Sequence, residues 1–227
     1  MPIITFASSK GGVGKSTSCA CLAGALVARK HSVHIVDLDT NGTISRWLGR
    51  SDRSSPIRVS SPDPAALTEH LEKVAASQSP DLILIDLAGS YERAITVAMA
   101  RAHLTIIPAA PSEADLFEAT RVANHLRQVF GAFNREPLYR LLLTQVQSLA
   151  SHAQTHAFRE IELLSIPRFQ AVLSHRAAYQ EIGLSGCPPH LSDTSRLTIT
   201  KAIAEIDAWL DETMTLIAST SQGKSAA

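Results

Sequence analysis

The chain has 227 residues, which is long enough for one large domain with a buried core or for two small domains. Hydrophobic residues make up 45% and charged residues 19%, and this composition excludes a disordered chain. Lysine plus arginine and aspartate plus glutamate both number 21, so the zero formal net charge excludes a global attraction to nucleic acid or acidic membranes.

Apolar runs of strand length alternate along the chain with stretches of helical patterning. The runs predict buried strands at residues 3–7, 33–36, 82–85, 104–107 and 141–143. The other stretches predict helices at residues 16–30, 64–77, 92–102, 113–130 and 195–218. Residues 51–64 predict a surface connection with a short extended piece at 57–59. This alternation predicts an α/β fold with a mostly parallel, doubly wound sheet and helices on both faces.

Residues 1–218 are predicted to form a single domain, and the small, polar residues 219–227 a flexible tail. The N-terminus lacks the basic and apolar regions of a signal peptide, and the chain has no run of about 18 apolar residues. The sequence therefore predicts a cytoplasmic protein that does not span a membrane.

Residues 10–17, with the sequence KGGVGKST, directly follow the first predicted strand and open the first predicted helix. This context predicts a P-loop, in which glycines let the backbone N–H groups and the helix N-terminus surround a di- or triphosphate. Lys15 is expected to reach the β- and γ-phosphates, and the Ser16 hydroxyl to ligate Mg²⁺. The predicted nucleotide-binding residues are Gly11, Gly12, Val13, Gly14, Lys15, Ser16 and Thr17.

Carboxylates follow two of the predicted strands. Asp86 ends the run DLILID, and Asp37 and Asp39 end the run VHIVDLD. Because ligands bind at the carboxyl ends of parallel strands, we expect Asp86 to hold the water shell of Mg²⁺ and Asp37 to support the metal or its waters. Asp39 is expected to orient the attacking water. Strand-capping or surface aspartates are the alternative interpretation of all three.

The segments KGGVGKST, VDLD and DLILIDLAG resemble those of the ParA/MinD family of deviant Walker ATPases, and of its short ParA-type partition ATPases in particular. Weaker similarity covers residues 107–115 (IPAAPSEAD) and 176–180 (RAAYQ). The resemblance implies the P-loop NTPase fold of the deviant Walker type, with ATP and Mg²⁺ as cofactors and slow ATP hydrolysis as the activity. It also implies a homodimer that forms in the ATP-bound state.

The resemblance also assigns roles to particular positions. Lys10 corresponds to the lysine that crosses the dimer interface to the partner's nucleotide, which makes it catalytic together with Lys15 and Asp39. Asp39 corresponds to the aspartate required for hydrolysis, Asp86 to the Walker B aspartate, and residues 87–91 to switch II. Three places depart from the family pattern, and at the first of them Ser9 stands where a strict P-loop has its first glycine. Thr40-Asn41-Gly42 stands in place of Pro-Gln, and Thr144-Gln145 stands in place of an asparagine that reads adenine.

Short members of the family bind DNA without sequence preference as ATP dimers. Residues 167–201 are the candidate region here, because Glu181 and Asp193 are their only acidic residues. A basic patch of this kind binds phosphates in a salt-dependent way, whereas solvated or helix-capping cations are the alternative. The predicted DNA contacts are Arg168, Arg176, Arg196 and Lys201, and they imply association with the nucleoid.

The resemblance therefore predicts a partition ATPase that positions a cargo such as a plasmid. A ParB-like centromere-binding or adaptor protein would stimulate its hydrolysis, and no membrane would take part. Relatives that position chemoreceptor arrays or carboxysomes, or that assist conjugative DNA transfer, share the motifs and stay open as alternatives. A metabolic ligase on the same scaffold, as in dethiobiotin synthetases, is the alternative from another class.

Overall fold

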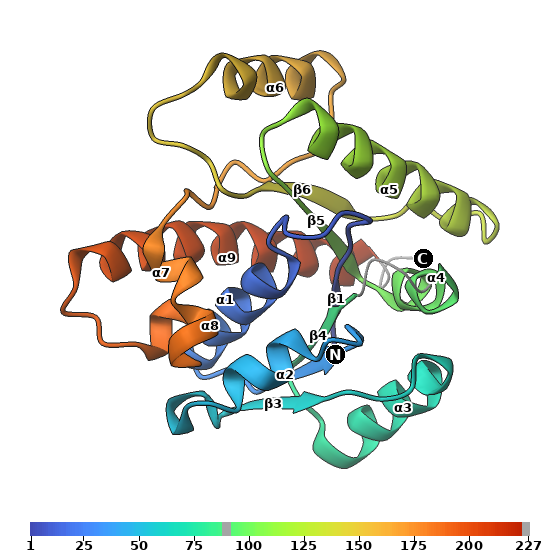
Figure 1. The fold of residues 1–227 in the computed structure, drawn as a ribbon. Coiled ribbons are helices and arrows are strands. Elements are labelled where there is room, and N and C mark those ends of the chain that lie inside the picture. Colours follow the sequence, from blue (N-terminus) through green and yellow to red (C-terminus); the bar gives the residue numbers. More distant parts are fainter. Residues whose placement is uncertain (88–91, 224–227) are drawn as a thin grey trace.

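The computed structural model describes residues 1–87 and 92–223, with the side chains of residues 92–94 and 220–223 left out. Its centre is a six-stranded sheet with the strand order β3-β2-β4-β1-β5-β6, and every neighbouring pair is parallel (Figure 1). The predicted doubly wound parallel sheet is thereby confirmed. The strands are β1 (Ile3–Phe6), β2 (Val33–Asp37), β3 (Ile57–Ser60), β4 (Leu82–Asp86), β5 (Leu104–Ala109) and β6 (Tyr139–Leu143).

Helices cover both faces of the sheet, because the strands carry apolar side chains on both sides. In β1, for example, Ile4 and Phe6 belong to one buried cluster and Ile3 belongs to the other. The first cluster packs against α1 (Lys15–Ala28), α2 (Thr43–Leu48), α7 (Ala177–Gln180), α8 (Ile182–Ser185) and α9 (Leu197–Gly223). The second packs against α3 (Leu67–Gln78), α4 (Glu92–Arg101), α5 (Glu113–Gly131) and α6 (His152–Leu163).

Aromatic side chains join the two ends of the described chain in the first cluster. Trp209 on α9 is fully buried, and its ring meets Phe6 of β1 edge to face with centroids 6.3 Å apart. It meets Phe169 in the same way at 6.1 Å. Such edge-to-face pairs stabilise a core beyond the area that they bury. Helix α9 therefore closes the face of the sheet on which β1 and α1 lie.

The observed elements differ from the predicted ones at a few places. The extended piece predicted at residues 57–59 is the edge strand β3, and helix α6 lies in a stretch for which no helix was predicted. Helix α9 continues to Gly223, five residues beyond its predicted end at 218, and residues 224–227 lie outside the described part. The flexible tail predicted for residues 219–227 stays a prediction. Within the described residues, no helix is long and apolar enough to cross a membrane.

Helix α1 lies close to its neighbours because one side of it is built from small residues. A Cβ placed on Gly24 would lie 2.6 Å from Cβ of Pro188, just before the short 3₁₀ helix Pro189–Leu191. Contacts this short force a shift, and neither the rigid proline ring nor the helix backbone can move easily. The glycine therefore allows this segment to pack directly on α1.

Replacing Gly24 by alanine is expected to lower the free energy of unfolding by about 1–3 kcal/mol, because the clash outweighs the roughly 1 kcal/mol gain in helix propensity. Gly131 ends α5, and no heavy atom lies within 4 Å of a Cβ built there. The matched Gly131→Ala variant should therefore stay within about 0.5 kcal/mol of the parent protein. Urea denaturation of both variants tests the prediction, and equal stabilities would contradict it.

Candidate functional site

The predicted P-loop connects β1 to α1 at the carboxyl end of the sheet. Gly12 and Gly14 have φ angles of +77° and +92°, which lie in a backbone region that residues other than glycine rarely adopt. Gly14 is the N-cap of α1 and supplies no capping side chain. The N-terminus of a helix without such a cap has backbone N–H groups available to an anion.

Lys15 and Ser16, the first residues of α1, lie at this loop. The Lys15 ammonium donates a hydrogen bond to the carbonyl oxygen of Lys10 at 2.9 Å, so the lysine side chain folds back over the loop. Burial lowers its pKa, although Asp86 and Asp39 oppose that shift. The Ser16 hydroxyl donates to Oδ2 of Asp86 at 2.6 Å. The structure thus brings Lys15, Ser16 and Asp86 together, as the sequence predicted.

Asp86 lies beneath the loop at the end of β4. It is 1% exposed and pairs in register with Asp37 at the end of β2. Burial raises the pKa of Asp86 to about 7; the Ser16 hydrogen bond opposes this shift, and the nearby carboxylate of Asp37 adds to it. Within the described residues, Oδ1 of Asp86 has no hydrogen-bond partner. A buried carboxylate with an unsatisfied oxygen requires a cation or a donor nearby.

These residues fit a magnesium ion. Mg²⁺ prefers oxygen ligands and keeps several waters, and it is typically bound by one or two protein oxygens together with substrate phosphates. The unpartnered Oδ1 of Asp86 and the adjacent Ser16 hydroxyl are groups of this kind. Asp86 and Ser16 would hold the ion or its waters beside the phosphates.

Asp39 lies in the loop between β2 and α2, and its carboxylate is held by its own loop. Oδ1 accepts hydrogen bonds from the backbone and side-chain nitrogens of Asn41 at 3.0 and 3.1 Å, and Oδ2 accepts one from the Thr43 hydroxyl at 3.2 Å. Gly42 provides the left-handed N-cap of α2. Asn41 and Thr43 therefore orient the Asp39 carboxylate through local hydrogen bonds.

Asp37 has a different environment from Asp39. Its Oδ1 accepts from the backbone N–H of Asp39 at 3.1 Å, and its Oδ2 accepts from the backbone N–H and the hydroxyl of Ser45 at 3.0 and 2.9 Å. The side chain is 1% exposed. These bonds fix the loop that carries Asp39, so the observed contacts of Asp37 are structural ones.

Thr144 and Gln145, just after β6, hold the P-loop from the other side. The Thr144 hydroxyl donates to the carbonyl of Val13 at 2.8 Å, and the Gln145 side-chain amide donates to the carbonyl of Gly12 at 2.7 Å. In place of the expected asparagine, these two side chains fix the shape of the phosphate loop. Nothing in the sequence indicates these two contacts.

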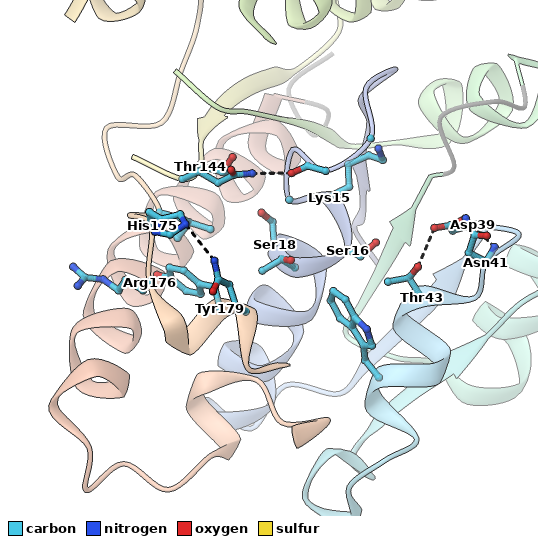
Figure 2. Close-up of a pocket in the computed structure, with 18 of the residues that line it drawn as sticks. Lys15, Ser16, Ser18, Asp39, Asn41, Thr43, Thr144, His175, Arg176 and Tyr179 are labelled. Atoms are coloured by element: carbon cyan, nitrogen blue, oxygen red, sulfur yellow. Dashed lines mark hydrogen bonds between the residues drawn. The ribbon is translucent and has the colours of Figure 1, made fainter. Parts of the chain in front are cut away.

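The described loop, Asp39 and the segment before α7 enclose a cavity of about 610 Å³. Figure 2 shows Asp39, Asn41 and Thr43 on one side of the P-loop and Arg176 and Tyr179 on the other. A cavity of this size, with a phosphate cradle at its floor, can contain a nucleotide.

A single carboxylate on α9 organises the wall opposite Asp39. Glu205 accepts hydrogen bonds from the backbone N–H and hydroxyl of Ser174, from the Arg176 guanidinium and from the Tyr179 hydroxyl, at 2.5–3.1 Å. Burial disfavours its charged form, but the bonds from Arg176, Ser174 and Tyr179 outweigh burial and lower the pKa of Glu205. Ser174, Arg176 and Tyr179 all line the cavity.

Replacing Glu205 by alanine is expected to weaken nucleotide binding about five- to tenfold, because several donors of the wall lose their common acceptor. Glu212 is the matched control. It accepts from the backbone N–H groups of Gln170 and Ala171 at 2.8 and 2.7 Å, which do not line the cavity. Both variants should lose stability, but only Glu205→Ala should change the affinity measured by calorimetry. Equal affinities in the two variants would contradict this role of Glu205.

Lys10 contacts its own chain and not the cavity. Its ammonium lies 2.6 Å from Oδ1 of Asp115 on α5, whose side chain is 7% exposed. The cross-subunit role predicted for Lys10 would require this ion pair to open. The predicted switch II, residues 87–91, lies outside the described residues except for Leu87, which lines the cavity.

Of the four predicted DNA contacts, Lys201 lies on α9, Arg196 just before α9, Arg176 just before α7, and Arg168 in the segment between α6 and α7. The Arg168 guanidinium donates to the carbonyl of Phe169 at 2.9 Å, and Arg176 pairs with Glu205 in the cavity wall. Arg196 pairs with Glu181 at 2.9 and 3.1 Å, and Lys201 is exposed on α9. Lys201 and Arg196 are exposed, whereas Arg168 and Arg176 are half-buried.

Comparison with known proteins gives a consistent result. A profile of the VirC1 protein family matches residues 1–212. The chain is 24% identical to Protein ParA of Rhizobium radiobacter, over 92% of this chain and 94% of that protein. It is 28% identical to the maintenance of carboxysome distribution protein A of Gloeobacter kilaueensis, over 81% of this chain and 82% of that protein.

A solved structure shares the fold. The septum site-determining protein MinD of Pyrococcus horikoshii, complexed with Mg-ADP, matches with a TM-score of 0.72 at 20% sequence identity. The match covers 95% of this chain and 98% of that one.

Proposed function

Because the chain belongs to the VirC1 protein family, within the ParA/MinD group of partition and positioning ATPases, we propose that it is an ATP-driven switch that positions a cargo such as a plasmid. The observation that carries the proposal is the convergence of Lys15, Ser16 and Asp86 at the P-loop, with Asp39 across the cavity. The proposed cofactors are ATP and Mg²⁺, and the proposed ATPase domain comprises residues 1–218 together with the rest of α9.

The proposed hydrolysis relies on positioning and charge. The P-loop backbone, residues Gly11 to Thr17, binds the phosphates, and the Lys15 ammonium stabilises the charge that develops on the γ-phosphate. Ser16 and Asp86, with Asp37 behind them, would hold Mg²⁺ or its waters, and the ion would supply positive charge beside the phosphates. The Asp39 carboxylate, fixed by Asn41 and Thr43, orients the water that attacks the γ-phosphate.

ATP is proposed to join two copies of the chain. Two triphosphates at one interface would repel each other, so cations from both copies must neutralise them. Lys10 would supply such a cation after leaving Asp115. Hydrolysis removes the γ-phosphate and the contact made to it, and the dimer loosens.

The ATP-bound dimer is proposed to bind DNA without sequence preference, which would place it on the nucleoid. Two copies of a weak basic patch bind together much more strongly than one. Lys201 and Arg196 are the best candidates for phosphate contacts because they are exposed, with Arg168 and Arg176 as further candidates. A ParB-like adaptor would stimulate hydrolysis and release the DNA.

A second candidate function differs only in the cargo. The 28% identity to a carboxysome distribution protein supports the positioning of a protein body instead of a plasmid. A role in conjugative DNA transfer stays in the same group of candidates, because relatives with that role share the motifs.

Retention of the chain on DNA in the presence of ATP, ADP or no nucleotide tests the proposal. We expect the chain to be retained on DNA with ATP and Mg²⁺ and not with ADP or without nucleotide. The retained fraction should fall steeply as the salt concentration rises. Charge reversal at Arg168, Arg196 and Lys201 together, which do not line the nucleotide cavity, should remove this retention. Retention that does not depend on the nucleotide, or a chain that stays monomeric with ATP, would refute the switch.

A further inference from the structure

A groove of about 730 Å³ lies beside the start of the P-loop, apart from the phosphate cavity. Ser9 and Lys10 line it from the loop, and α5 contributes Glu113, Ala114, Phe117, Glu118 and Arg121. Their spacing of one, three and four residues places them on one face of α5. The opposite face of α5 packs in the core through Leu116, Ala119, Val122 and Ala123. We call the outward face, with Ser9 and Lys10, the α5 groove.

Phe117 is the large apolar residue of the α5 groove, and its side chain is 65% exposed. Aromatic side chains at the centre of a surface are the typical anchors of protein interfaces, because they bury a large area at a small cost in side-chain entropy. The groove gives this ring a concave setting next to charged side chains.

Hydrogen bonds hold the α5 groove in a fixed position relative to the P-loop. The Ser9 hydroxyl donates to Glu118 at 2.5 Å, and Lys10 pairs with Asp115 at 2.6 Å. The Arg121 guanidinium donates to Oε1 of the same Glu118 carboxylate at 3.0 Å. A partner that docks on Phe117 therefore meets Ser9, Glu118 and Arg121 in a preorganised arrangement. Lys10 lies directly beside them, and its own pair with Asp115 would open when it reaches across the interface.

The charges of the α5 groove favour a second copy of the same chain over nucleic acid. With Lys10 set aside for the partner's nucleotide, Arg121 is positive, Glu113 and Glu118 are negative, and Phe117 lies among them. A two-fold interface brings the same patch of both copies together, so a patch with both signs can match itself. The phosphates of DNA would be repelled by both glutamates.

We propose that a second copy of this chain docks on the α5 groove and that Phe117 is the apolar anchor of that contact. This inference rests on the proposed ATP-dependent dimer and adds to it a contact surface beside Lys10. The partner's α5 groove would occupy the same place on the other copy, as a two-fold axis requires.

The first test compares Phe117→Ala with Phe133→Ala. Phe133 follows the end of α5 and is 66% exposed, but it does not line the groove. With a non-hydrolysable ATP analogue and Mg²⁺, Phe117→Ala should raise the dissociation constant of the dimer about tenfold or more in sedimentation experiments, and Phe133→Ala should leave it unchanged. Nucleotide binding and the melting temperature should be unchanged in both, since both rings are exposed.

A second test measures burial of the site directly. Cysteine is introduced by Phe117→Cys or Phe133→Cys, and alkylation is followed with and without the ATP analogue. The native thiols of Cys19, Cys21 and Cys187 are buried, so they should react slowly. The analogue should slow alkylation at position 117 at least about tenfold and leave position 133 unaffected, because docking covers only the α5 groove.

The outcomes separate the inference from the proposed function. A Phe117→Ala chain that dimerises as the parent does, equal losses in both alanine variants, or no protection at position 117 would overturn the docking surface and leave the ATP-dependent dimer standing. Normal dimerisation with loss of stimulation by an adaptor would assign the groove to that adaptor and also overturn the inference. A parent chain that stays monomeric with ATP would overturn the proposed function itself.

Discussion

Replacing Lys15 by alanine is expected to lower ATP turnover by roughly 10²- to 10³-fold and to weaken ATP binding strongly, because a preorganised cation is lost where charge develops. The Lys15 ammonium already lies over the loop, where it donates a hydrogen bond to the Lys10 carbonyl, and Lys15 lines the cavity. No other lysine lines the cavity within the described residues, so nothing on the same chain replaces it there.

Lys10→Ala is the matched control, since it removes a lysine from the same loop. The Lys10 side chain lies against Asp115 and lines the α5 groove, so monomeric ATP binding should stay close to that of the parent chain. The dimer, however, should be lost. Fluorescence titration with a labelled ATP analogue and a phosphate-release assay measure both effects. If Lys15→Ala bound and hydrolysed ATP normally, the phosphate site would lie elsewhere.

Replacing Asp39 by alanine is expected to slow hydrolysis by about 10²-fold or more, because positioned general bases typically contribute 10²–10⁴-fold. ATP binding and dimer formation should remain, since the phosphate cradle does not depend on this carboxylate. The dimer should therefore persist longer on DNA. Single-turnover hydrolysis and the time for which the complex stays on DNA are the quantities to measure.

Asp63→Ala is the control for the loss of loop stability that follows when an aspartate bonded to its own loop is removed. Oδ1 of Asp63 accepts from the backbone N–H two residues later, at 2.8 Å, just as Oδ1 of Asp39 does at 3.0 Å. Asp63, unlike Asp39, does not line the cavity. A similar loss of activity in both variants would show that the Asp39 effect comes from loop stability and not from catalysis.

The sheet could be predicted from the sequence because strands buried on both faces are continuous apolar runs. Helix α6 was missed because its buried side includes Gln154, which bonds to the backbone of Gln147, so the apolar pattern is interrupted. The end of α9 was placed too early, since Ser219 and its neighbours are small and polar but continue the helix.

The phosphate side of the site could also be predicted, because the ends of parallel strands meet at one edge and therefore bring Ser16 to Asp86. The ion pairs between distant residues that complete the site could not be predicted from the sequence. Glu205 and Arg176 come from separate elements, as do Lys10 and Asp115, and nothing in a single sequence shows which charges pair. The segment IPAAPSEAD contained Asp115, but its spacing gives no indication of the partner.

The contact between Phe6 and Trp209 affects how the chain folds during synthesis. The first strand leaves the ribosome long before α9 does. The apolar face formed by β1 and α1 therefore stays exposed to solvent until α9 has been synthesised and can pack on it. Contacts between residues so distant in sequence also slow folding. We therefore expect the nascent chain to be a client of chaperones until α9 has emerged.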